Sequence, residues 1–321
     1  MAWHTNHNIL IQGSENLLAQ YYFPRMIAYG TQIVGGVSAG GGGQTLAGLP
    51  IFDLVTEAKE QFGDITTSLI FVEPFAVLDA AFEAIAAGIK QLIIISAGVP
   101  PLDMVRLLCE AQRQGVQILG PGSSGLVMPG KLWLGTSFVD QFQPGEVALL
   151  SRFSSLSQEV AILLNQAGLG QTYGVDIGNA ELPGSNFTQW LQYLDQDPDT
   201  KAIALLGRYG SQEEIDLIPL IRDHIKTPVV TYLCGSHAPI HQSCHDASTI
   251  IANQLSYSIS DTYTPAEMHS AFKQEKLAFA RTPKEIPTLL KKALQPPRNR
   301  RRSPKSADPD PSALSPESDL G

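Results

Sequence analysis

Short apolar runs alternate with longer amphipathic stretches along most of this chain, and this alternation restricts the fold more than any other feature. The runs are of strand length, and the stretches between them, such as AVLDAAFEAIAAGIK (76–90), have helical periodicity. A first series comprises NILIQG, QIVGGV, SLIFVE, QLIIIS and VQILG, and a second comprises EVALLS, YGVDIG, AIALLGR and PVVTYLCG. We therefore predict an α/β fold with parallel sheets.

The two series are separated by a Gly/Pro/Ser-rich stretch that predicts a domain boundary. We expect a first domain over residues 1–122, a linker over 123–145 and a second domain over 146–294. From residue 295 onward the chain is dominated by Pro, Ser and charged residues with almost nothing to bury. The segment 295–321 is therefore predicted to be a disordered tail.

Charge and cysteine content narrow the classes of function. The formal net charge is -9 with scattered acidic residues, so nucleic-acid binding is not expected. The three cysteines lack metal-binding spacing, and no metal site is predicted. The start of the chain lacks the pattern of a signal peptide, and its apolar runs are too short to span a membrane. We expect a cytoplasmic protein without membrane contact.

Four segments carry a family resemblance. They are IAYGTQIVGGVSAGGGGQTLAGLPIFD (27–53), EAIAAGIKQLIIISAGVPPLDM (83–104), ILGPGSSGLVMPG (118–130) and LPGSNF (182–187). In order and spacing they resemble the α subunit of succinyl-CoA synthetase (succinate–CoA ligase). The resemblance implies a Rossmann-like CoA-binding domain followed by a flavodoxin-like ligase domain. It also implies a histidine that carries phosphate from a nucleotide site on an ATP-grasp β subunit, so that ATP or GTP would bind only through that partner.

The first glycine-rich loop departs from the family pattern GxTGxxG. Gly13 is kept in QGSENLLAQ, but Glu15, Asn16 and Ala19 stand where the pattern has Thr, Gly and Gly. A carboxylate repels phosphate, and side chains at positions 16 and 19 would block a close approach of the backbone. We therefore expect CoA to bind weakly.

The second glycine-rich loop, SAGGGGQT, keeps Gly40, Gly42 and Gly43 but has Gly41 where the family typically has a lysine. The shape of a phosphate-binding loop is thus retained without its cation. The alternative is a flexible turn without a ligand.

The family segment SRSGT corresponds here to SRFSSLSQE. Ser154 and Ser155 could bind an anion at the start of a helix, although Phe153 narrows the approach. The alternative is that one of these serines only caps the helix.

The loop SCHDASTIIANQ (243–254) contains the position of the phosphorylated histidine. Without a gap, the family's glycine falls on His245 and its histidine on Asp246, whereas a slip of one residue restores the histidine at His245. The family's orienting glutamate is replaced by Arg208. Asp246 itself could accept phosphate as an acyl phosphate. Alternatively, Asp246 pairs with Arg208 and holds the loop in place, or Arg208 binds a phosphate or carboxylate ligand.

Three functional hypotheses follow. The leading one is a succinyl-CoA synthetase α-like protein without the phosphohistidine mechanism, which acts as a binding, regulatory or assembly subunit. The second is a working succinate–CoA ligase α subunit that uses His245. The third is a CoA or nucleotide sensor. The expected partners are an ATP-grasp β-like subunit and a small ligand, either CoA or a carboxylate.

Overall fold

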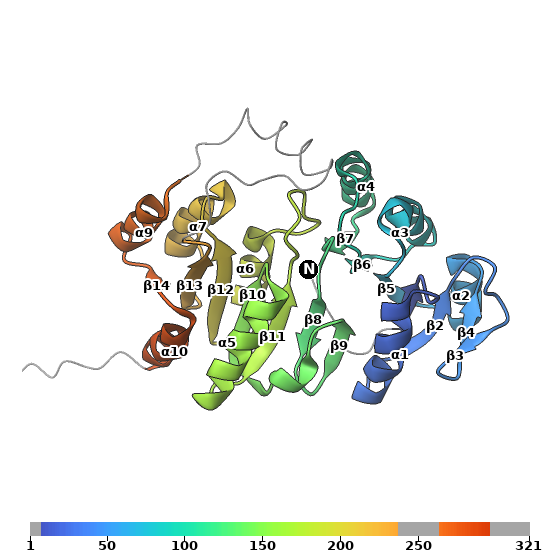
Figure 1. Cartoon of the computed structure of the whole chain (residues 1–321), viewed down its shortest axis with the longest axis horizontal. Helices are drawn as coiled ribbons and strands as arrows, with labels where there is room; N and C mark the ends of the chain where they lie inside the picture. Colours follow the sequence, from blue (N-terminus) through green and yellow to red (C-terminus); the bar gives the residue numbers. More distant parts are fainter. Residues whose placement is uncertain (1–7, 237–262, 296–321) are drawn as a thin grey trace, which may run out of the picture.

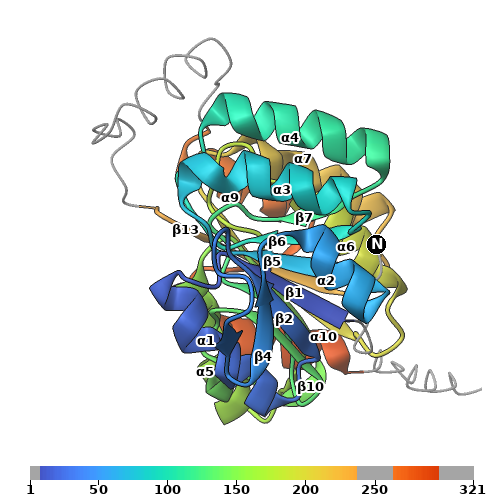
Figure 2. The same cartoon turned by 90° about the vertical axis from the view of Figure 1, so that its right-hand side faces the viewer.

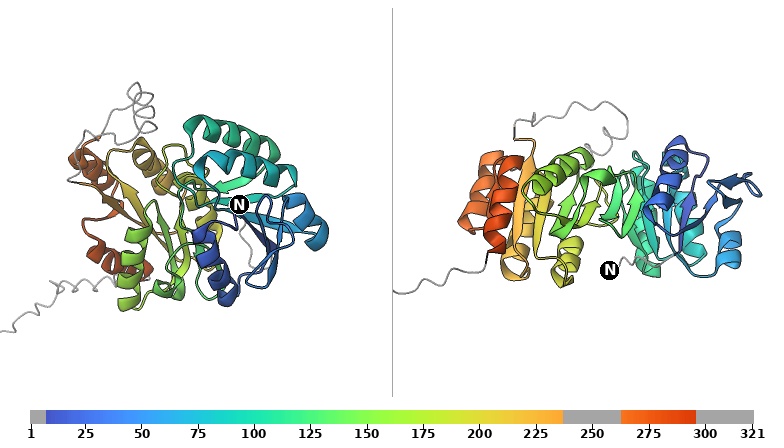
Figure 3. Two further views of the ribbon diagram at one scale, coloured as in Figure 1. Left: turned by 45° about the vertical axis from the view of Figure 1, so that its right-hand side comes forward. Right: turned by 90° about the horizontal axis from the view of Figure 1, so that it is seen from below.

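The computed structural model describes residues 8–236 and 263–295. Within these ranges the chain forms two seven-stranded sheets, each covered by helices. The two sheets lie side by side along the long axis of the molecule, with β8 (Gly125–Met128) and β9 (Leu132–Gly135) between them (Figures 1 and 3).

The first sheet has the strand order β3-β4-β2-β1-β5-β6-β7. Apart from the short hairpin β3–β4 its pairs are parallel, and β4-β2-β1-β5-β6-β7 is the Rossmann order 3-2-1-4-5-6. Its strands are β1 (Asn8–Gln12), β2 (Ile33–Val37), β3 (Thr45–Leu46), β4 (Leu49–Phe52), β5 (Ile65–Ile70), β6 (Gln91–Ile94) and β7 (Gln117–Leu119). Most of these strands are continuous apolar runs because both faces of the sheet are covered.

The helices of the first sheet divide between its two faces. On one face lie α2 (Val55–Phe62), α3 (Val77–Ala86) and α4 (Pro101–Gln114) (Figure 2). Their buried residues form a separate core with alternate residues of the strands. On the other face, α1 (Leu17–Tyr29) buries Ala19, Phe23 and Met26, which have helical spacing. This second core is continuous with that of the second sheet.

The second sheet has the strand order β14-β13-β12-β10-β11-β8-β9. Its five parallel strands, read as β11-β10-β12-β13-β14, have the flavodoxin order 2-1-3-4-5. Their bounds are β10 (Pro144–Ser151), β11 (Gln171–Asp176), β12 (Ala202–Arg208), β13 (Val229–Cys234) and β14 (Ala278–Ala280). The α/β class and both predicted domain types are therefore confirmed.

Five helices and three short 3-10 turns complete the described fold. The helices are α5 (Ser154–Gln166), α6 (Phe187–Gln196), α7 (Gln212–Asp223), α9 (Pro265–Gln274) and α10 (Ile286–Leu294), and the turns are η1 (Pro74–Ala76), η2 (Val139–Gln141) and η3 (Pro283–Glu285). In α6, Asn186 and Gln189 form a capping box, and Phe187, Trp190 and Leu194 are fully buried. Helix α6 therefore supplies some of the largest side chains of the core.

The segment 123–145, predicted as a linker, contributes two strands to the second sheet. β8 pairs antiparallel with β11, and β9 pairs antiparallel with β8. The outer strand β9 contacts the N-terminal domain, where the Thr31 hydroxyl donates to the Trp133 carbonyl at 2.8 Å and accepts from its N–H at 3.2 Å. The Tyr29 hydroxyl accepts from the Gly130 N–H at 2.7 Å. We keep residue 122 as the proposed end of the first domain, because β7 ends at Leu119 and β8 already belongs to the second sheet.

Some sequence predictions fall outside the described residues. They concern His245, Asp246 and the proposed tail beyond residue 295. None of the helices within residues 8–236 and 263–295 combines the length and the apolar character that a membrane span requires.

Candidate functional site

Open parallel sheets bind ligands at the carboxyl ends of their strands, where the chain reverses its direction across the sheet. In the first sheet this point lies between β1 and β5, because β2 and β4 follow on one side of β1 and β6 and β7 on the other side of β5. The turn after β1 and the glycine-rich loop after β2 meet at this edge. The predicted cofactor-binding glycines therefore lie in two adjacent loops.

Gly13 occupies a position that no other residue fits. Its φ angle is 80°, and a Cβ there would lie 2.7 Å from the Val72 backbone nitrogen, at the end of the neighbouring β5. Its N–H donates to the Val37 carbonyl at 2.9 Å, so the turn is also tied to β2. This glycine brings three strand ends together.

The three replacements in the first loop have different roles. Asn16 is the N-cap of α1, and its side chain accepts from the Leu18 N–H at 2.9 Å. Ala19 is fully buried in the core, so its side chain does not line the loop as we expected. Glu15 is exposed beside the turn. The exposed carboxylate of Glu15 and the cap formed by Asn16 are therefore the two replacements that lie at this turn, and their effect on phosphate binding stays a prediction.

The second loop is a closed turn. Gly40 and Gly43 have φ angles of 76° and 83°, and a Cβ at either position would meet no atom within 4 Å. The Gly42 N–H donates to Asp53 Oδ1 at 3.0 Å. The loop therefore has open space on its outer side, whereas on its inner side it is held by a carboxylate.

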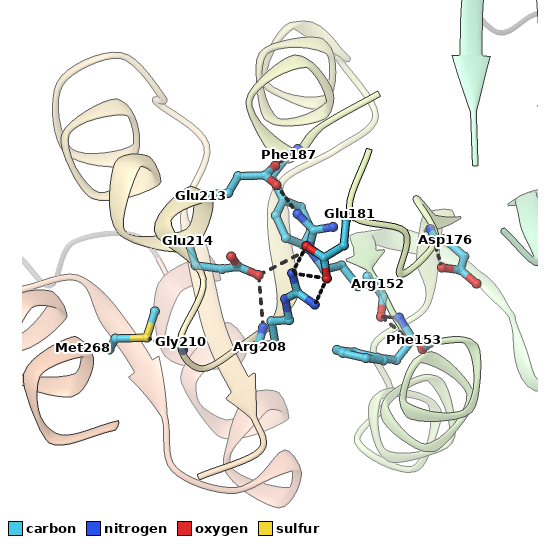
Figure 4. A network of polar contacts seen from close by, with 12 residues as sticks. Arg152, Phe153, Asp176, Glu181, Phe187, Arg208, Gly210, Glu213, Glu214 and Met268 are labelled. Carbon is cyan, nitrogen blue, oxygen red and sulfur yellow. Dashed lines mark hydrogen bonds and ion pairs between the residues drawn. The ribbon is translucent and has the colours of Figure 1, made fainter. Parts of the chain in front are cut away.

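The second sheet reverses its direction between β10 and β12, and a cluster of charged residues lies at that edge (Figure 4). Arg152 follows β10 and is only 4% exposed. Its guanidinium forms ion pairs with Glu213 and with Glu214, in the latter case at 3.3 Å from Nε to Oε1. It also lies over the Phe187 ring, 4.9 Å from the centroid. This buried arginine joins β10, α6 and α7.

The two glutamates extend the cluster to the backbone. Glu213 accepts from the Phe187 N–H at 2.9 Å, at the start of α6. Glu214 Oε1 accepts from the Arg208 N–H at 3.1 Å. Within the described part of the chain, the buried Glu214 Oε2 has no hydrogen-bond partner. Glu214 thus fixes the chain at the end of β12, and Glu213 fixes the start of α6.

Arg208 differs from Arg152 in both exposure and partner. Its side chain is 27% exposed and pairs with Glu181, which is 60% exposed, at 3.3 Å. Together the cluster holds two guanidinium groups and three carboxylates. An anion that binds Arg208 would therefore compete with Glu181 for the guanidinium. The predicted pair with Asp246 involves a residue outside the described ranges.

Ser154 and Ser155 lie at the first two positions of α5, and the N-cap is Phe153. Neither serine therefore occupies the capping position. The Ser154 hydroxyl accepts from the Gln158 side chain at 3.3 Å, and Ser155 is exposed. Anion binding by these residues stays a prediction.

A buried carboxyl that the sequence analysis did not single out lies beside α5. Asp176, at the end of β11, accepts from the Ser124 N–H at 3.0 Å, the Ser124 hydroxyl at 2.7 Å and the Gly178 N–H at 3.0 Å. A small pocket between it and α5 is lined in part by Ser137, Ser154 and other polar residues. Burial raises the pKa of the Asp176 carboxyl, and the hydrogen bonds from Ser124 and Gly178 act against this rise.

The raised pKa of Asp176 gives a pH-dependent stability. Its carboxyl binds a proton more tightly in the folded than in the unfolded chain. The contribution of this group to the free energy of unfolding therefore decreases as the pH rises above about 4. Asp176→Asn removes this titration. We compare the free energy of unfolding of the native protein with that of the variant. We expect the difference, native minus variant, to decrease as the pH rises from about 4 to about 7. Urea unfolding at both pH values measures it, and a constant or rising difference would contradict the assignment.

Comparisons with known proteins agree with this architecture. The family model of the CoA binding domain matches residues 4–98, and that of the CoA-ligase domain matches residues 150–272. The succinate–CoA ligase [ADP-forming] subunit alpha 2 of Archaeoglobus fulgidus is 34% identical over 287 residues, which cover 89% of this chain and 96% of that protein. The chain belongs to the succinate–CoA ligase α-subunit family. The malate–CoA ligase subunit alpha of Methylorubrum extorquens is 35% identical over 76% of this chain and 83% of its own length.

Solved structures show the same fold outside the α subunits of this family. ATP citrate lyase from Methanothrix soehngenii superposes with a TM-score of 0.76 over 92% of this chain, at 19% identity. The chain spans 50% of that enzyme's length. At this level of identity the likeness concerns the fold alone.

Besides Asp176, the sequence analysis missed further residues of these sites, among them Arg152, Glu214 and Asp53. Arg152 lies in the quoted segment SRFSSLSQE, and Glu214 lies six residues after Arg208, but only their neighbours were assigned roles. Asp53 ends the first segment that carries the family resemblance and was not considered. An arginine directly after a buried strand was a usable signal, because a charged residue that is buried must be paired.

Proposed function

We propose that this chain acts as the α subunit of an acid–CoA ligase, joining CoA to a small dicarboxylic acid with consumption of a nucleoside triphosphate. The observation that carries the proposal is the likeness to the Archaeoglobus α subunit, which extends over both domains. The relatives favour this catalytic role over our leading sequence hypothesis of a non-catalytic subunit. Succinate and malate, named in the relatives, are both four-carbon dicarboxylates.

The N-terminal domain is the proposed site of CoA. The phosphates of CoA would lie at the carboxyl edge of the sheet between β1 and β5, against the turn at Gly13 and the loop around Gly40 and Gly43. The open space outside these two loop glycines fits such a ligand. The exposed carboxylate of Glu15 makes the site weaker than one lined by cations. When bound, CoA supplies the thiol that becomes the thioester.

The nucleotide is proposed to bind to a separate ATP-grasp β subunit. The family names of the relatives, each called an alpha subunit, support such a partner. The phosphate carrier would be His245, which lies outside the described residues. Arg208 and its partner Glu181 would lie at the edge of the ligase domain that faces the reaction.

A second candidate is a binding or regulatory subunit without phosphate transfer. One observation favours it: Arg208, where the family has a glutamate, is held by Glu181 and by the Glu214 contact to its backbone. In this arrangement no carboxylate at position 208 remains to orient a histidine.

The two candidates differ in an experiment on the full chain co-purified with an ATP-grasp β subunit from the same genome. The mixture is given CoA, labelled ATP or GTP, and either succinate or malate, and acyl-CoA is trapped as a hydroxamate. We expect hydroxamate and an acid-labile phosphate that is lost in His245→Asn and kept in Asp246→Asn. If the two subunits co-purify but form no hydroxamate and carry no acid-labile phosphate, the regulatory subunit is favoured. Absence of co-purification would contradict both.

A further inference from the structure

The carboxyl edge of the first sheet is acidic. Glu15 follows β1, Asp53 follows β4 and Glu73 follows β5, and all three are exposed. Residues 8–116 contain five Lys and Arg residues, none of which lies in the loops after β1, β2, β4 or β5: Arg25, Lys59, Lys90, Arg106 and Arg113. Four of them lie on helices and Lys90 precedes β6 at the opposite edge. An anionic ligand therefore meets carboxylates in these loops without a compensating cation.

Asp53 is the acidic residue closest to the glycine loop. Its Oδ1 accepts from the Gly42 N–H at 3.0 Å, and a Cβ at residue 42 would lie 2.4 Å from its Oδ2. The carboxylate thus lies directly against the loop backbone. Its own N–H donates to Glu57 Oε2 at 3.1 Å, so the first turn of α2 fixes the position of Asp53.

Three other N–H groups of this turn are also occupied within the protein. The Gly41 N–H donates to the Ser38 carbonyl at 2.9 Å, that of Gly43 to the Ile51 carbonyl at 3.1 Å, and that of Gln44 to the Gly41 carbonyl at 3.2 Å. A glycine loop binds phosphate by directing such groups outward. Here Gly42 directs its N–H to a carboxylate of the protein itself.

We propose that Asp53 sets the affinity and specificity of this loop for its ligand. Its carboxylate accepts from the Gly42 N–H in place of an anionic group of a ligand, and its negative charge repels the phosphates of CoA. The inference rests on the proposed CoA site and concerns how strongly that site binds. Asp53 acts as a positioning residue of the loop and makes no contact with the reacting atoms. The loop accordingly favours ligands with little negative charge next to Gly42.

The substitution Asp53→Asn separates charge from structure, because an amide oxygen still accepts from the Gly42 N–H. We expect this variant to bind CoA about fivefold more tightly than the native protein at low salt, since one negative charge near the phosphates is removed. Added NaCl should tighten CoA binding to the native protein, because it screens repulsion, and should do so less in the variant. Titration calorimetry with the full chain and CoA at two salt concentrations measures both effects.

The matched control is Asp64→Asn, which makes the same charge change at an exposed residue just before β5, at the opposite edge of the sheet. It should leave CoA affinity unchanged. An equal gain in both variants would overturn the inference, because net charge alone would then explain it. Equal and measurable binding by native protein and Asp53→Asn would also overturn it while leaving the CoA site intact. No binding by either protein would overturn both the inference and the CoA part of the proposed function.

A second measurement is independent of CoA. Asp53→Ala removes the acceptor of the Gly42 N–H, so hydrogen exchange at this amide should become at least about tenfold faster, whereas in Asp53→Asn it should stay slow. Unchanged exchange in Asp53→Ala would show that the carboxylate does not hold the loop.

Discussion

Replacing Arg152 by alanine is expected to lower the free energy of unfolding by about 3–5 kcal/mol, because it leaves two carboxylates without their buried cation. Glu214 is fully buried and would keep only the Arg208 N–H as a donor. The contact of the guanidinium with the Phe187 ring would be lost as well. Urea unfolding followed by circular dichroism measures this change.

Arg208→Ala is the matched control for Arg152. It also removes an arginine paired with a glutamate at the same edge of the sheet, but both side chains are accessible to solvent. Its expected cost is about 0–1 kcal/mol. The double variant Arg152→Met with Glu214→Leu should be more stable than Arg152→Ala, because the buried charge is removed together with its partner. Similar costs for the two arginines would contradict the structural role assigned to Arg152.

Gly13→Ala is expected to cost about 3 kcal/mol or more and to abolish measurable CoA binding. An alanine would have to adopt a left-handed backbone, which costs about 1–2 kcal/mol, and its Cβ would collide with the backbone of β5 at Val72. Relief of the collision moves the turn after β1 away from β5. The loss of CoA binding follows because this turn forms the floor of the proposed site. Thermal unfolding and calorimetry with CoA test the two parts.

Gly30→Ala separates strain from collision. Gly30 also has a positive φ angle, 103°, but a Cβ there would meet nothing within 4 Å. Its expected cost is about 1–2 kcal/mol, with CoA affinity unchanged. If Gly13→Ala costs no more than this control, the close approach to β5 is unimportant.

The fold was largely predictable because strand positions depend on local apolar runs. The run QLIIIS contains β6, and EVALLS contains most of β10. The strands β8 and β9 were missed because GLVM and LWLG are four-residue runs among glycine and proline, where local pattern favours a loop. The pairing of β8 with β11 depends on residues about 50 positions further along the chain, which short-range periodicity does not reveal, and β9 joins the sheet only through β8.

The candidate sites were only partly predictable, for a related reason. The glycines were found because a family pattern marks them, and Gly13 indeed lies at the close approach of two strands. The partners of Arg152 are 61 and 62 residues away in sequence, so its burial follows from the fold alone. Ala19 was assigned to the ligand side, whereas the helical spacing of Ala19, Phe23 and Met26 directs it to the core.

The contact of β9 with Thr31 has a consequence for separating the two halves of the protein. β9 ends the second sheet, and the Trp133 N–H and carbonyl that are not used by β8 are satisfied by the Thr31 hydroxyl of the N-terminal domain. Unpaired groups on an outer strand are a template for strands of other chains, and proteins cover such edges to avoid aggregation. The N-terminal domain therefore also covers the outer strand β9. A ligase domain released by proteolysis would expose this strand and would be prone to self-association.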